Sequence, residues 1–489
     1  MRRRLVRVFF LFIAVVFQTV PASAQNSSTA RESRTSSAAL KLLFSGPQDI
    51  TDSWGQLRFG VTPVRLIREI APPDFTVVGC FPKSDGTWKV FGQQMTPVNR
   101  SETTYKETNS WKLVRATTRD GVTFNNAKVV IDQPPGPWTS HVAMAYNPIA
   151  KEYVLLKLKM DSYGFAYTAF FSADGEKWQP YSGNPLFYDA DAMSLFWSPV
   201  LKRLVCVSKS LQPYRKHIRD HGGPTRSLGD DALRDRRVLM IRSSPDGRRW
   251  EPSVSLSDVW DRHGQKGAIS SELLTLPDHD DPPDLEFYSG NAFWYHDRAY
   301  MTVLNYAASP LMPSKHGPQL DNEWWTSPDG LHWQRPARDV NALAVFPEVL
   351  RLETHPLITS GMILFPRGKY LLGLPEDRIS FVSARANGEF STRPFKMPLA
   401  NLALNAAVPA PGRSFAREQS YVMAAILDEK GGVIPGFEAS KCVIRNEDRR
   451  DIPLKWAETS ARQLAGRTIR LRFFLRSANI YAVTSEIAP

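Results

Sequence analysis

Short apolar runs of strand length, separated by turn residues, fill the sequence from about Leu42 onward. Val, Ile, Phe, Tyr and Trp are frequent within these runs, and Gly, Pro, Asn, Asp and Ser are frequent between them. No convincing amphipathic helix interrupts the series. This pattern is typical of an all-β sandwich, barrel or propeller.

One turn sequence recurs along the chain. It reads SPDGLHW at 327–333, SPDGRRW at 244–250 and SADGEKW at 172–178, with weaker versions at 118–124 and 385–390. Asp-Gly or Asn-Gly between two apolar runs is a strong hairpin signal, because these residues tolerate a positive φ. The aromatic residue that follows can pack on neighbouring strands. Five such hairpins predict five structural repeats.

Each repeat reads as four strands, and four-stranded units repeated around an axis form a β-propeller. The repeats span residues 76–131, 141–181, 192–254, 288–335 and 360–395. In the last repeat, strands are predicted at 360–365, 369–374, 379–384 and 389–395. The prediction is a five-bladed β-propeller. The alternative, five unrelated hairpins in one large sandwich, does not explain how the connections sort by length.

The connection between the first and second strands is short in every predicted repeat. In a four-stranded antiparallel blade, the second-to-third and fourth-to-first connections share the opposite end. The long segments at about 212–235, 255–287 and 307–320 all belong to that second set. Binding sites tend to lie on long loops held by a rigid scaffold. We therefore expect the functional face at the end that carries these loops.

The two ends of the chain differ from the repeats. Residues 1–24 read as a signal peptide, with arginines, an apolar core and a small-residue cleavage site. The alternative is an uncut membrane anchor, although the core is shorter than the ~20 residues of a span. Residues 25–41 are predicted as a disordered leader, 42–398 as the propeller and 399–489 as a small β-sandwich. We expect a secreted or periplasmic protein with no membrane span after cleavage.

Composition narrows the possible partners. The formal net charge is +12 over 489 residues and shrinks when the four arginines of the signal are removed. A mild positive excess fits an acidic polymer or a cell-surface partner. No Lys/Arg run or nucleic-acid motif is present, so no nucleic-acid partner is expected. The three cysteines are too few and too far apart for a disulfide scaffold or a cysteine metal site.

The hairpin aspartates, such as Asp246 and Asp329, lie at the wrong end of the blades for catalysis and are expected to accept turn N–H bonds. The informative acids are Asp191 and Glu286, which open the innermost strands of adjacent repeats. Two carboxylates facing one funnel suit general acid and base roles across a glycosidic bond. The alternative is that both carboxylates only pair with basic neighbours.

Further polar residues belong to the same face. Their expected role is to orient substrate, since Arg and Lys bind hydroxyls or a carboxylate well; they are His141, Lys209, Tyr214, Arg215, Tyr288 and Tyr306. His217 and His221 are spaced like a metal pair, but no third ligand clusters with them. Neither a metal nor another cofactor is expected.

Taken together, the five repeats, the acid before the third inner strand and the acidic-aromatic start of the fourth resemble the five-bladed propeller glycoside hydrolases. They resemble more closely the secreted bacterial proteins similar to the family 32 (invertase-like) N-terminal domain, in which a β-sandwich follows the propeller. The C-terminal pattern carries this likeness through Asp428, Gly432, Gly436-Phe437, Cys442, Trp456 and Leu471-Arg472-Phe473.

The resemblance implies a glycoside hydrolase-like protein that acts on a polysaccharide or glycoconjugate. Asp191 would be the base or charge stabiliser, Glu286 the acid and Asp74 a third carboxylate. The invertase-like nucleophile motif is absent, and the corresponding segment 71–77 holds Asp74 as its single acid. Fructan cleavage is therefore not supported. The hairpins also resemble the boxes of sialidases, although the Phe-Arg-Ile-Pro motif of that group is absent.

A non-catalytic propeller that binds glycans or proteins through the same face, and a sialidase-like enzyme, remain the alternatives. The state of the two acids separates hydrolysis from binding. A separation of about 5–10 Å between carboxyl groups fits hydrolysis. Carboxylates that are locked in ion pairs fit binding.

Overall fold

The computed structural model describes most of the chain beyond its N-terminal segment. It covers residues 40–99, 108–137, 141–161, 164–188, 191–213, 235–251, 259–262, 265–268, 272–275, 277–278, 280–282, 285–308, 316–343, 352, 355–359, 361–410, 420–457 and 459–485. The predicted signal peptide and residues 25–39 of the predicted leader lie outside these ranges. In the described part, no helix is both long and apolar enough to cross a membrane.

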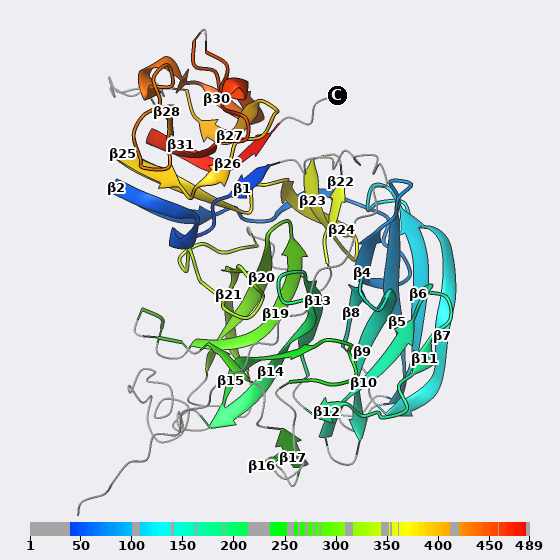
Figure 1. The fold of residues 1–489 in the computed structure, drawn as a ribbon. Coiled ribbons are helices and arrows are strands. Elements are labelled where there is room, and N and C mark those ends of the chain that lie inside the picture. Colours follow the sequence, from blue (N-terminus) through cyan, green and yellow to red (C-terminus); the bar gives the residue numbers. More distant parts are fainter. Residues whose placement is uncertain are drawn as a thin grey trace, which may run out of the picture. The chain divides into compact units, whose positions relative to one another are not determined.

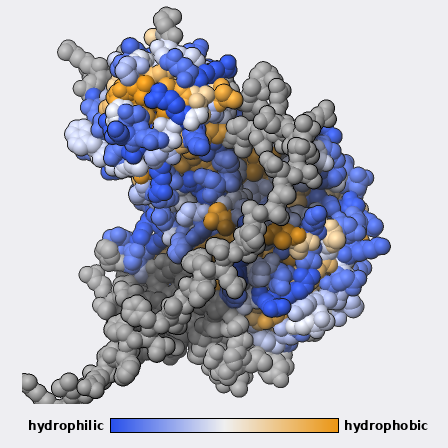
Figure 2. All heavy atoms as spheres, viewed as in Figure 1, coloured by the Kyte–Doolittle hydropathy of each residue, from blue (hydrophilic) through white to orange (hydrophobic). Residues whose placement is uncertain are grey.

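Five antiparallel sheets surround a central axis, which confirms the predicted all-β, five-bladed propeller (Figure 1). The first sheet contains β4 (Thr76–Pro82), β5 (Trp88–Asn99), β6 (Thr108–Thr118) and β7 (Asn125–Pro137). The second contains β8 (Val142–Asn147), β9 (Glu152–Asp161), β10 (Gly164–Ser172), β11 (Gln179–Pro180) and β12 (Phe187–Tyr188). In each, the strands follow one another outward in chain order, with β12 also paired to β10. The surface over β6 and β7 is largely hydrophilic (Figure 2).

In the third and fourth blades, the fourth strand is short or is reduced to a single bridge. The third contains β13 (Met193–Ser198), β14 (Arg203–Pro213), β15 (Asp235–Ser244) and β18 (Glu272–Thr275), and the hairpin β16 (Val259–Arg262) and β17 (Gln265–Ala268) lies in the link that follows. The fourth contains β19 (Leu285–Tyr295), β20 (Arg298–Ala308) and β21 (His316–Ser327). After the third strand of each, a single bridge continues the sheet: Ser243 with Glu251, and Thr326 with Gln334.

The fifth blade differs from its prediction. Its strand order is β22 (Leu357–Thr359), β23 (Met362–Arg367), β24 (Tyr370–Pro375) and β3 (Arg65–Glu69). The segments predicted as its outer strands form one strand, β25 (Ser380–Thr392), which pairs with β2 (Ile50–Val61) and β31 (Thr468–Ser485) instead. A strand from before the first repeat thus completes the last blade. This closure covers a sheet edge that would otherwise be open to pairing with other chains.

Apolar clusters between neighbouring blades hold the ring together. One joins Phe91 and Trp111 of the first blade to Leu155 of the second, and similar clusters join the second to the third and the third to the fourth. Another joins the fourth blade to the fifth. The last joins Val90 of the first blade to Leu364 of the fifth. Each cluster removes apolar surface from water, which stabilises the folded ring by about 25 cal/mol for each Å² buried.

The aspartates of the four Asp-Gly hairpins accept backbone N–H bonds, as predicted. Asp246 Oδ1 accepts the N–H groups of Arg248 and Arg249 at 2.8 and 2.9 Å. Gly247 has φ 75°, a left-handed conformation that suits glycine. Trp250 Nε1 donates to the carbonyl of Gly247 at 3.0 Å, which ties the aromatic to its own turn. The fifth predicted hairpin, 385–390, lies within β25 instead.

The residues after the propeller join strands from the start of the chain in one nine-stranded network. Its members are β1 (Lys41–Leu43), β2 (Ile50–Val61), β25, β26 (Phe395–Lys396), β27 (Leu402–Val408), β28 (Tyr421–Leu427), β29 (Val443–Ile444), β30 (Glu447–Pro453) and β31 (Thr468–Ser485). Three short 3-10 helices accompany the described strands: η1 (Pro47–Asp49), η5 (Ala439–Lys441) and η6 (Ala461–Leu464). The predicted β-sandwich stays a prediction.

A buried ion pair connects this N-terminal segment to the fourth blade. Arg298, the first residue of β20, is 7% exposed and donates from Nη1 to Asp49 Oδ2 at 2.7 Å. The same carboxylate accepts the backbone N–H groups of Ser45 and Gly46. The segment that leads to β3 is thereby fixed on the ring before β3 completes the fifth blade.

We predict that Asp246→Asn lowers the free energy of unfolding by about 1 kcal/mol, because hydrogen bonds to an ionised acceptor weaken when its charge is removed. Burial would raise the pKa of Asp246, but its bonds from Arg249 and Arg248 lower it below the ordinary value. The stabilisation is therefore present above the unfolded pKa and is lost as pH falls through the folded one. Urea unfolding at pH 7 and pH 3 measures both effects. The exposed Asp339→Asn is the control, and equal losses in the two variants would contradict the prediction.

Candidate functional site

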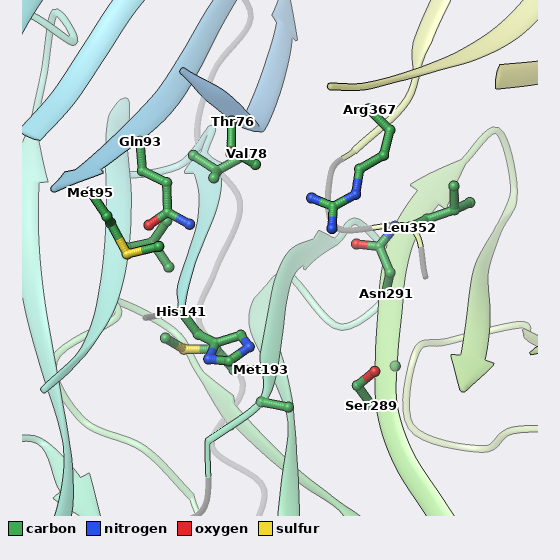
Figure 3. Close-up of a pocket in the computed structure, with 13 residues that line it drawn as sticks. Thr76, Val78, Gln93, Met95, His141, Met193, Ser289, Asn291, Leu352 and Arg367 are labelled. Atoms are coloured by element: carbon green, nitrogen blue, oxygen red, sulfur yellow. The ribbon is translucent and has the colours of Figure 1, made fainter. Parts of the chain in front are cut away.

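A cavity of about 320 Å³ lies at the axis, and all five blades contribute to its wall (Figure 3). The described lining residues are Thr76, Val78, Gln93 and Met95 from the first blade, His141 and Val142 from the second, Ala192 and Met193 from the third, Ser289, Gly290 and Asn291 from the fourth, and Leu352 and Arg367 before and within the fifth. Its size is at the lower end of the about 300–1,000 Å³ usual for small-molecule sites.

Local strand geometry brings the polar side chains to this wall. His141 directly precedes β8, and Met193 is the first residue of β13, so the starts of inner strands meet at the axis. In β19 the pairing with β20 shifts register between Phe287 and Ser289. Such bulges re-aim side chains. After the bulge, Ser289 and Asn291, two residues apart in β19, both line the cavity.

Gln93 is held in place from behind. Trp111 Nε1 donates to Gln93 Oε1 at 3.2 Å, and Trp111 is only 1% exposed. Lys157 Nζ lies 4.7 Å from the Trp111 ring centroid and bonds to Gln133. Burial, followed by the charge of Lys159, lowers the pKa of Lys157 to about 8. The side-chain amide of Gln93 is thus oriented by Trp111, whose ring is in turn covered by the buried amine of Lys157.

Asp191 lies directly before Ala192 of the cavity wall and pairs with Lys209. Tyr288 connects to both residues: its hydroxyl lies 3.5 Å from Asp191 Oδ2, and Lys209 Nζ lies 4.1 Å from its ring centroid. The ring of Tyr306 lies 4.9 Å from that of Tyr288. Four residues predicted for the site are therefore brought together here.

The carboxyl group of Asp191 is ionised at neutral pH. Burial alone would raise its pKa, but the charge of Lys209, the charge of His141 and the Lys209 hydrogen bond outweigh burial and hold the pKa well below its usual range. An acid of this kind has no proton to give. It can act as a base, as a stabiliser of positive charge or as an acceptor of hydroxyl hydrogen bonds.

Glu286 is 2% exposed and is engaged on both oxygens. Arg237 Nη1 donates to Oε2 at 2.7 Å and the Arg237 backbone N–H to Oε1 at 3.3 Å. The Arg237 guanidinium lies 5.8 Å from the Tyr288 ring centroid, so this pair borders the Asp191 cluster. Glu286 is not among the described residues that line the cavity. Both acids are thus locked in ion pairs, the arrangement that favours binding.

The other predicted residues divide into three groups. His141 lines the cavity, and its charge acts on Asp191. The side chain of Asp74 is exposed and is not among the described lining residues, although Thr76, two residues later, is. Tyr214 and Arg215 lie outside the described residues. Among the described residues, no group of three or more His, Cys, Asp or Glu is placed to hold a metal ion.

Sequence reasoning missed Gln93, Ser289, Asn291 and Arg367. Arg367 ends β23, whose turn to β24 was interpreted as a first-to-second connection at the far end of the blades. Because β22 precedes β23 in the sheet, this turn joins the second and third strands. It therefore belongs at the end where the long loops lie. No local signal marked Gln93, Ser289 or Asn291, since polar residues inside strands are ordinary.

Several solved structures are similar to this chain at low sequence identity. They include a glycosyl hydrolase from Bacteroides ovatus at 11% identity, covering 65% of this chain and 93% of that one, with a TM-score of 0.39. A member of the GH130 family of mannoside phosphorylases, which contains hydrolases that target β-1,2 mannosidic linkages in Candida mannan, is 13% identical over 66% and 95%, with a TM-score of 0.36. A family 117 glycoside hydrolase from Zobellia galactanivorans is 8% identical over 60% and 77%, with a TM-score of 0.31.

No protein-family model matches the chain, and no curated protein matches it. Likeness at these TM-scores carries no argument about activity, and the propeller is established by the strand pairing itself. The resemblance to the family 32 domain stays an inference from sequence.

We predict that Glu286→Gln lowers the free energy of unfolding by about 3–5 kcal/mol, because it leaves the Arg237 charge buried without its partner. The double variant Glu286→Gln/Arg237→Gln should recover a large part of that loss. Glu251→Gln, which removes an exposed partner of Arg203, is the control and should cost at most about 1 kcal/mol. Chemical denaturation measures all three. Unchanged stability in Glu286→Gln would show that this carboxylate does not hold the structure.

Proposed function

We propose that the protein recognises a carbohydrate in the axial cavity. The observation that carries the proposal is the convergence of residues from all five blades on one cavity of about 320 Å³, with hydrogen-bonding side chains from the first, second, fourth and fifth. A site built from five separate segments of a closed ring is fixed in shape before a ligand arrives. Preorganisation of this kind reduces the entropic cost of binding.

The chemistry of the wall supports a sugar. Gln93, His141, Ser289 and Asn291 present amide, imidazole and hydroxyl groups, whereas Val78, Met95, Met193 and Leu352 present apolar surface. A sugar ring has hydroxyl groups at its edge and C–H groups on its faces, so both kinds of surface find a partner. In Figure 3 the polar groups of Gln93, His141 and Asn291 lie around the same central space.

Hydrolysis in the same cavity is the second candidate, and the ionised Asp191 favours it. Beside His141, this carboxylate suits the predicted role of base or charge stabiliser. The contacts of Glu286 with Arg237 support a positioning role in place of the predicted acid. In this version Asp74 keeps its predicted place as a third carboxylate. Export of the protein, as the N-terminal sequence predicts, would bring it to extracellular or periplasmic glycans.

The test is a panel of glycans measured for binding and for released reducing sugar with the same purified protein. Asn291→Ala should lower the affinity for the best ligand by about 3- to 10-fold, which corresponds to the loss of one neutral hydrogen bond. Asn125→Ala, at an exposed position of β7, is the control and should bind as the parent does. Release of sugar that is lost in Asp191→Asn supports hydrolysis, and binding without release supports recognition alone. No binding by any glycan would overturn the proposal.

A further inference from the structure

We propose that the axial cavity selects glycans that carry an anionic group, a hexuronate carboxylate or a sulfate ester, and that Arg367 is the residue that recognises it. The inference rests on the proposed function and names the class of ligand for the same site. It is carried by the charges on the cavity wall and by the placement of one guanidinium.

The described wall contains basic groups and no acidic ones. Arg367 and His141 line the cavity, and neither Asp nor Glu is among the described lining residues. The remaining polar wall consists of two amides, Gln93 and Asn291, and the hydroxyls of Thr76 and Ser289. Among the described lining residues, an anionic ligand group would meet hydrogen-bond donors and no carboxylate.

The carboxylates behind the wall are each neutralised by a cation. Asp191 pairs with Lys209, whose side chain is 5% exposed. Glu286 pairs with Arg237 at 2.7 Å. These pairs reduce the negative potential that two bare carboxylates would impose on the cavity, because opposite charges at contact distance cancel at longer range.

Arg367 is placed to bind an anion through its planar fork. It is the last residue of β23, and its guanidinium points into the space between Gln93 and Asn291 (Figure 3). A guanidinium donates two parallel N–H bonds to a carboxylate, or bonds to two oxygens of a sulfate, which lysine does not reproduce. The side chain comes from the fifth blade, which packs between the first and fourth blades.

Gln93 adds a fixed donor. Its Oε1 accepts the Trp111 indole N–H at 3.2 Å, which fixes the orientation of the amide and makes the NH₂ group its donor end. Trp111 is buried and carries Lys157 on its ring, so the glutamine has little freedom to turn over. The fixed amide of the first blade therefore faces the space into which Arg367 points.

The experiment compares neutral, uronate and sulfated oligosaccharides built on the same sugar backbones, by titration calorimetry with the full chain. The anionic members should bind at least about 10-fold tighter than their neutral counterparts, as one charge-assisted contact predicts. The uronate and sulfate arms identify which anion is preferred. Arg367→Met should remove the preference and Arg367→Lys should keep part of it. Arg58→Met, at an exposed position of β2, is the matched control and should change nothing.

Asn291→Asp tests the same point without touching the arginine. It keeps the side-chain shape and places a carboxylate on the wall, so it should lower the affinity for the anionic ligands by about 10-fold or more beyond any loss that it causes for the neutral ones. Equal affinity for neutral and anionic partners, or a preference that survives Arg367→Met, would overturn this inference and leave glycan recognition standing. No binding by any member would overturn both proposals.

Discussion

Packing between neighbouring blades is the interaction on which the rest of this structure depends. Each sheet is apolar on the faces it turns to its neighbours, and the five inter-blade clusters succeed one another around the ring. The ring is complete only because β3 pairs with β24, with Tyr370 opposite Glu69. Because the chain runs on from β3 into β4, this pairing also ties the fifth blade to the first through the backbone.

The site follows from this closure. Inner strands that pack side by side bring their first residues to the axis, so side chains more than 200 residues apart in sequence share one cavity. Buried charges beside a compact wall must be paired. Lys209 pairs with Asp191, and Arg237 pairs with Glu286. Lys209 holds the pKa of Asp191 low and makes it a poor proton donor, while the described cavity wall keeps its hydrogen-bond donors and its arginine. Structure and binding chemistry therefore favour a recognition site first and a hydrolytic one second.

Much of the fold could be predicted from local signals. Asp-Gly hairpins and period-two runs are decided by nearby residues, and strands such as β4 and β9 lie where the pattern puts them. The fifth blade could not be predicted this way, because the choice between β25 and β3 as its outer strand depends on pairing over more than 300 residues. At the site, Asp191, Lys209, Tyr288 and Tyr306 do come together. Their ion pairs and the role of Arg367 depend on which neighbours the ring supplies, and no local motif encodes that.

Hydrogen exchange with and without the best-binding glycan tests the central claim most directly. If the ligand occupies the axial cavity, amides near residues 76–78, 93–95, 141–142, 192–193, 289–291 and 367 should all gain protection, because each blade contributes to the wall. The strands of the C-terminal network, such as β28 and β30, should exchange as before. Protection confined to one blade, or to the C-terminal strands, would contradict the account and place the ligand elsewhere.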